Sequence, residues 1–98
     1  MHQFMIDITL PAVLTKEFIA LVPQQRVQVG RLLNERRLTS FSLAQDRSKC
    51  WATMLAESEA EVREILASFP LREFMKVKIH QLQFVENAPA LVAHISLN

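Results

Sequence analysis

The sequence has a single cysteine, Cys50, and a single glycine, Gly30. A lone cysteine excludes an intrachain disulfide and suggests no cysteine-based metal site. With one glycine there is no glycine-rich loop of the kind that cradles phosphates. Gly30 falls inside a helical pattern, where glycine costs about 1 kcal/mol relative to alanine. We therefore expect another part of the backbone to pack closely against the helix at that point.

An excess of charge and long apolar runs are also missing. The formal net charge is +1, which gives no case for a nucleic-acid or membrane partner. The apolar runs are far shorter than the roughly 20 residues that cross a bilayer. The first ten residues, "MHQFMIDITL", lack the basic start, long apolar stretch and small-residue cleavage site of a signal peptide. These absences predict a cytoplasmic protein with no nucleic-acid partner, no membrane partner and no metal site.

Hydrophobic residues, by contrast, make up 50% of the 98 positions, enough for one domain with one modest core. Alternation of period two predicts strands, since successive strand residues point to opposite faces. The expected strands cover residues 2–10, 39–44, 50–55 and 76–84, with a fifth over 91–97. In the fourth strand the apolar phase changes after His80, which predicts a bulge or a bend near His80 and Gln81.

Two helical patterns separate these strands. Pro23 interrupts the first, so we expect a short turn from Thr15 and a main helix that begins at Pro23, where a missing N–H costs nothing. Ser58 followed by Glu61 is a capping box at the start of the second helix. The apolar stripe of that helix has the required spacing and consists of Val62, Ile65, Leu66 and Phe69.

The resulting order, βαββαβ, predicts an α+β, ferredoxin-like fold: a four-stranded antiparallel sheet with both helices on one face. The other face, represented by Met5, Ala44 and Met54, is expected to be too apolar for exposure to solvent. This predicts a dimeric α/β barrel in which two sheets face each other. The apolar connection 68–80 is expected to close the end of the core and to lie near the partner chain. Residues 1–85 form the predicted domain. The tail 86–98 is expected to pair with a neighbouring subunit, with a frayed terminus as the alternative.

One long run, "LNERRLTSFSLAQDRSKCWATMLAESEAEVREILASFPLREFMKVKIHQL", resembles the muconolactone isomerase family. The similarity lies in a helix, a hairpin, a capped second helix ending in Phe69-Pro70, and the Phe74-Met75 pair before the last strand. The resemblance implies a proton-shifting isomerase that acts on an unsaturated lactone carrying a carboxylate, without a cofactor. Such chemistry needs a base, a donor to the developing enolate oxygen and a cation for the carboxylate.

Several residues are candidates for these roles. Members of that family carry a candidate glutamate base in the first turns of the main helix, where this chain has Gln25 and Arg26. Arg26 suits a carboxylate clamp, with a surface ion pair as the alternative. His80 is the candidate acid–base residue because its pKa is ordinarily near neutrality, and a structural hydrogen bond is the alternative role. Trp51 is a candidate for lining the site or for core packing.

Two functions stay open on the sequence. The first is a cofactor-independent isomerase that acts by proton transfer on a small unsaturated carboxylate or lactone. The second is a non-catalytic protein of the same fold that binds a small ligand or serves as an oligomeric scaffold. In both, the partners are a small anionic ligand and further copies of the chain. Convergence of Arg26, Trp51 and His80 on one pocket is the observation that would favour the enzyme.

Overall fold

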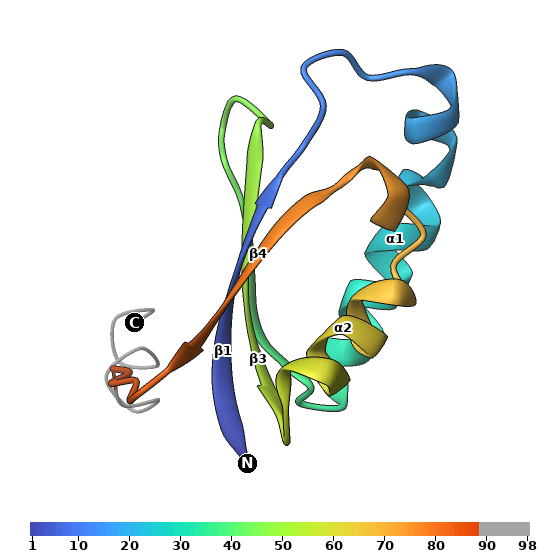
Figure 1. The fold of residues 1–98 in the computed structure, drawn as a ribbon. Helices are drawn as coiled ribbons and strands as arrows, with labels where there is room; N and C mark the ends of the chain where they lie inside the picture. Colours follow the sequence, from blue (N-terminus) through green and yellow to red (C-terminus); the bar gives the residue numbers. More distant parts are fainter. Residues whose placement is uncertain (89–98) are drawn as a thin grey trace, which may run out of the picture.

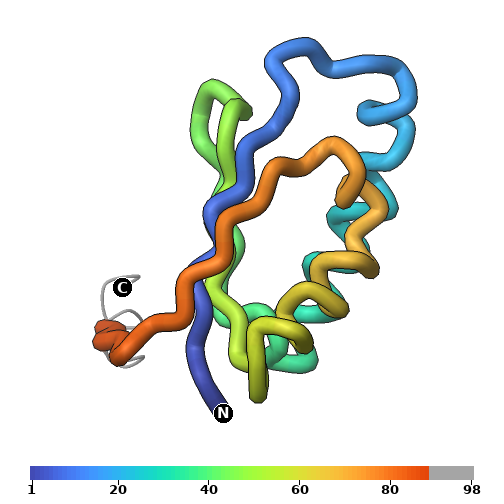
Figure 2. Tube along the Cα trace, viewed as in Figure 1, coloured from blue at the N-terminus to red at the C-terminus, as the bar shows by residue number. Residues whose placement is uncertain are grey.

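The computed structural model describes residues 1–88, which form a four-stranded antiparallel sheet with two helices on one of its faces (Figure 1). The strands lie in the order β2-β3-β1-β4, and the Cα trace shows both helices on the same side of them (Figure 2). The predicted ferredoxin-like fold is confirmed. The elements are β1 (His2–Thr9), α1 (Lys16–Asn34), β2 (Leu38–Leu43), β3 (Lys49–Ala56), α2 (Glu59–Ala67), the 3-10 turn η1 (Arg72–Phe74) and β4 (Lys76–Leu82). The fifth strand and most of the tail expected from the sequence lie outside the described residues.

The core lies between the sheet and the helices, and β1 supplies its centre. Phe4, Ile6 and Ile8 are fully buried there, as the alternation in β1 predicted. From β3 the inward side chains are Cys50, Ala52, Met54 and Ala56. Met54 therefore belongs to the core, and its predicted place on the outer face of the sheet is wrong. The small inward residues of β3 made its two faces look equally apolar in the sequence.

The outer face of the sheet is more polar than expected. Its apolar side chains are Met5, Trp51, Leu55 and Leu82, and polar or charged residues lie among them. The Nζ atom of Lys49 lies 2.6 Å from a carboxylate oxygen of Asp7 on this face. Ala44, also predicted here, follows the end of β2.

Strand β4 pairs with β1 without interruption, from Gln3 opposite Leu82 to Thr9 opposite Lys76. The bulge or bend predicted near His80 and Gln81 is therefore wrong, because the pairing runs through both residues. Gln81 holds a helix-side position opposite Phe4 but is solvent-exposed. A polar residue is tolerated there because β4 is an edge strand. The register shift of this sheet instead falls in β2, between Leu38 and Ser40.

Helix α1 is one continuous helix with Pro23 inside it, so the break predicted at that proline is wrong. Thr15 caps the helix, and its hydroxyl accepts a hydrogen bond of 3.2 Å from the N–H of Phe18. Proline removes one backbone hydrogen bond from a helix interior. Here Phe18, Gln25 and Leu32, spaced seven residues apart on either side of Pro23, are all buried, and this packing outweighs the loss.

The apolar connection between α2 and β4 closes one end of the core, as predicted. Phe69, Leu71 and Met75 are buried. The rings of Phe74 and Phe18 pack edge to face with centroids 5.4 Å apart. Ser58 caps α2 by accepting a hydrogen bond of 3.2 Å from the N–H of Glu61. Within residues 1–88, none of the helices has the length and apolarity needed to cross a bilayer.

Candidate functional site

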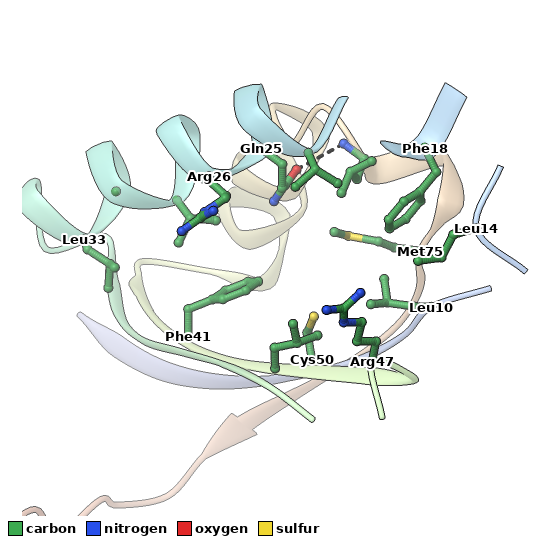
Figure 3. Close-up of a pocket in the computed structure, with 15 residues that line it drawn as sticks. Leu10, Leu14, Phe18, Gln25, Arg26, Leu33, Phe41, Arg47, Cys50 and Met75 are labelled. Atoms are coloured by element: carbon green, nitrogen blue, oxygen red, sulfur yellow. Dashed lines mark hydrogen bonds between the residues drawn. The ribbon is translucent and has the colours of Figure 1, made fainter. Parts of the chain in front are cut away.

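A cavity of about 650 Å³ lies between α1 and the β2–β3 hairpin (Figure 3). Helix α1 forms one wall, and the hairpin forms the other. The loop after β1 and the connection before β4 close one end. Most of the lining is apolar, and it consists of Leu10, Leu14, Phe18, Val22, Gln25, Arg26, Val29, Gly30, Leu33, Phe41, Leu43, Arg47, Cys50, Leu71 and Met75.

Gln25 places an unused hydrogen-bond donor at this cavity. Its side chain is only 6% exposed, and its Oε1 accepts a hydrogen bond of 3.1 Å from the N–H of Leu71. Because a backbone N–H can only face the amide oxygen, this bond fixes which end of the amide is nitrogen. The buried Nε2 has no partner among the described residues, and Figure 3 shows it on the cavity side of the amide.

Two arginines enter the lining from opposite walls. Arg26 is part of α1, and Arg47 belongs to the turn between β2 and β3 (Figure 3). Neither forms an ion pair with any residue between 1 and 88. No aspartate, glutamate or histidine is among the described residues of the lining. The cavity therefore combines two permanent positive charges, one free amide donor and apolar walls, an arrangement suited to a small organic anion.

The turn that carries Arg47 is held in an unusual conformation. Arg47 has a φ of 65°, in the left-handed region that non-glycine residues adopt at a cost. A carboxylate oxygen of Asp46 accepts hydrogen bonds from the N–H of Ser48 at 3.0 Å and from its hydroxyl at 2.7 Å. These bonds hold the pKa of Asp46 below its ordinary value of 3.8. Asp46 thus has a structural role in the turn.

Cys50 lines the cavity as a neutral thiol. It is buried, and that burial raises the pKa of the thiol above its ordinary value of 9.0. Since the thiolate is the nucleophilic form, Cys50 is not an activated nucleophile. Elsewhere in the described part of the chain, no three histidine, cysteine, aspartate or glutamate side chains gather closely enough to hold a metal ion.

The structure divides the four residues predicted from the sequence between the two faces of the sheet. Gln25 and Arg26 line the cavity. Trp51 and His80 lie on the outer face, opposite Asp7 and Met5 respectively. The convergence on one pocket does not occur within one chain, because strand alternation directs Trp51 and His80 away from the helices.

Arg47 and Gly30 also line the cavity and were not among the site residues predicted from the sequence. Arg47 belongs to the turn between β2 and β3, and no local sequence signal shows that its side chain reaches a cavity. Gly30 was expected to pack against another backbone, and that prediction is wrong. A Cβ atom built on Gly30 meets nothing within 4 Å. The helix at this point faces open cavity space.

The fold and the site define a ferredoxin-like α+β protein with an anion-suited cavity between its first helix and its sheet. No protein-family model matches the sequence, and no curated protein matches it. A solved structure with a similar fold is 5-chloro-2-hydroxyhydroquinone dehydrochlorinase (TftG) from Burkholderia phenoliruptrix AC1100, in complex with 2,5-dihydroxybenzoquinone. The TM-score is 0.69 at 13% sequence identity, and the match covers 85% of this chain and 95% of that chain. At this identity the similarity establishes a shared fold.

Proposed function

We propose that this protein binds a small unsaturated organic anion in the α1 cavity. The observation that carries the proposal is the buried Nε2 of Gln25, which faces the cavity without a partner among the described residues. Leaving a buried donor unsatisfied costs about 1–3 kcal/mol. A carbonyl or carboxylate oxygen of a ligand would offset that cost.

The rest of the lining narrows the class of ligand. The cavity volume of about 650 Å³ falls within the range that holds small organic molecules. Its apolar walls favour a hydrocarbon body, while Arg26 and Arg47 favour a negative charge, which their planar guanidinium groups bind with two parallel hydrogen bonds. A small unsaturated carboxylate, a lactone carrying a carboxylate, or an acidic hydroxyquinone meets these requirements.

Binding of simple probes tests this proposal. Titration with 2-naphthoate and 2,5-dihydroxybenzoquinone, followed by NMR, should shift the side-chain amide signals of Gln25. The neutral analogue 2-naphthamide should bind more weakly. Replacing Arg26 or Arg47 by Gln should weaken binding of the anions about tenfold or more, since a hydrogen bond to a charged group contributes about 1.5–3 kcal/mol.

The matched control is Arg63→Gln, because Arg63 lies on α2 in an exposed ion pair with Glu59. It should bind the probes as the unmodified protein does. Equal affinity for 2-naphthoate and 2-naphthamide, or no response at Gln25 to any probe, would contradict the proposal.

A second candidate function is the isomerase indicated by the family resemblance. The amide of Gln25 and the two guanidinium groups are the kinds of donor that stabilise an enolate oxygen as it develops. The protein of similar fold is named as a dehydrochlorinase and was solved with an unsaturated, oxygen-rich ligand. A base is the missing part, since the described lining offers no carboxylate and no histidine. His80 remains the proposed base, and it would have to act on a substrate bound by another chain.

Deuterium exchange separates the two candidates. The isomerase should move a proton in an unsaturated lactone that carries a carboxylate, and in D₂O the product should contain deuterium at carbon. His80→Ala should abolish that exchange while leaving probe binding and the unfolding curve unchanged. If the unmodified protein binds the lactone without exchange, the isomerase is excluded and only the binding function remains. Exchange that persists in the His80 variant would exclude His80 as the base.

A further inference from the structure

The only glycine of the sequence lies in the wall of this cavity, and nothing in the described chain requires a glycine there. Gly30 is inside α1, so no turn depends on it, and it has no positive φ. An added Cβ atom would meet no neighbour within 4 Å. Glycine nevertheless destabilises a helix interior relative to alanine. The chain keeps a destabilising residue at a point that opens into the cavity.

We infer that Gly30 is a specificity-determining residue whose missing side chain leaves room for the ring of a bound ligand against α1. The inference rests on the proposed binding function and adds the shape of the ligand. Arg26 lies one helical turn before Gly30, and Leu33 lies one turn after it. Both also line the cavity.

The direction of helical side chains connects Gly30 with Arg26. Side chains on a helix lean toward its N-terminus, so a side chain at position 30 would cover the surface beside Arg26. A ligand that places its anionic group on Arg26 therefore has its body over Gly30. There the surface is bare backbone, which a planar ring can approach to van der Waals contact. The ligand class is a flat aromatic or conjugated anion rather than a branched aliphatic one.

Substitutions at position 30 test this inference through two opposite effects. Gly30→Ala should raise the melting temperature by about 4–8 °C, the shift expected for about 1 kcal/mol in a domain of this size. The same change should weaken 2-naphthoate binding about fivefold or more, since one extra methyl group in a filled space is poorly accommodated. Gly30→Leu should abolish measurable binding. Benzoate, a smaller ring, should lose less affinity than 2-naphthoate in Gly30→Ala.

Ala20→Leu is the matched control, because Ala20 is an exposed position of the same helix and is not part of the cavity lining. It should bind 2-naphthoate as the unmodified protein does. Unchanged affinity in both Gly30 variants would overturn the role of Gly30 and leave the binding function standing. A lowered melting temperature in Gly30→Ala would also overturn it, because the space would then not be open. If the unmodified protein binds no probe at Gln25, the binding function fails, and this inference fails with it.

Discussion

At the scale of single residues, Gln25 joins the stability of the fold to the chemistry of the cavity. Its Oε1 accepts a hydrogen bond from the backbone N–H of Leu71, in the connection that leads into β4, while its Nε2 has no partner within residues 1–88. A buried polar group must recover its lost hydration through hydrogen bonds, and among the described residues only the Oε1 end of this amide does so. The half-satisfied amide therefore points to a binding role.

Replacing Gln25 by Met should lower the free energy of unfolding by about 1 kcal/mol, because the buried N–H of Leu71 loses its acceptor and removal of the unpartnered Nε2 offsets only part of that cost. Urea unfolding measures the effect. Gln24→Met is the control, since Gln24 is exposed on the same helix. It should change the free energy by less than about 0.5 kcal/mol. Equal losses in the two variants would show that the hydrogen bond between Gln25 and Leu71 does not stabilise the fold.

At the scale of elements, the β2–β3 turn brings Arg47 to the cavity. The carboxylate of Asp46 organises that turn through Ser48, and its pKa is lowered by the hydrogen bonds it accepts. A group whose pKa is lower in the folded state stabilises that state above its unfolded pKa. The contribution is lost as the pH falls through the folded value. The turn should therefore be fully stabilised above about pH 5 and progressively less so below about pH 4.

Urea unfolding between pH 3 and pH 7 checks this prediction with two variants. Asp46→Ala, which removes the acceptor, should be less stable than the unmodified protein near neutral pH, and the difference should shrink as the pH falls below about 4. Asp46→Asn keeps an acceptor for Ser48 but cannot titrate. In that variant, the contribution of residue 46 to the free energy of unfolding should therefore not vary with pH. If the free energies of unfolding of Asp46→Ala and the unmodified protein differ by the same amount across this range, the ionised carboxylate of Asp46 does not stabilise the turn.

At the scale of the whole molecule, the outer face of the sheet is the surface through which we expect the chain to self-associate. Trp51 is 39% exposed there, and Met5, Leu55 and Leu82 are partly buried on the same face. We expect two copies to pack these faces together. Trp51→Lys should weaken association, measured by sedimentation at micromolar concentration. Ile19→Lys, at an exposed position of α1 outside the cavity lining, should not.

Trp51 is the only tryptophan of the sequence, so its fluorescence reports on the same surface. Its emission should shift to shorter wavelength as protein concentration rises. A monomer with constant emission at all concentrations would contradict the dimer.

The predicted contribution of the tail is tested separately, by removing the residues after Glu86. The shortened chain should associate more weakly and keep its secondary structure.

The sequence by itself determined the features that depend on neighbouring residues. The buried face of β1, the cap of α2 at Ser58 and the order of the elements were all predictable, because periodicity and capping are local properties. The wrong predictions share a different cause. Whether α1 continues through Pro23 depends on the burial of residues on both sides of the proline. Whether Met54 points into the core depends on which side of the sheet the helices cover.

The candidate site was predictable only in part, for the same reason. Gln25 and Arg26 could be selected because the family resemblance points to the stretch of helix that holds them. Tertiary structure alone placed Trp51 and His80 on the far side of the sheet, opened the space at Gly30 and carried Arg47 into the cavity. A cavity forms between segments distant in the sequence, so its lining depends on how α1 and the hairpin pack together. No local pattern encodes that packing.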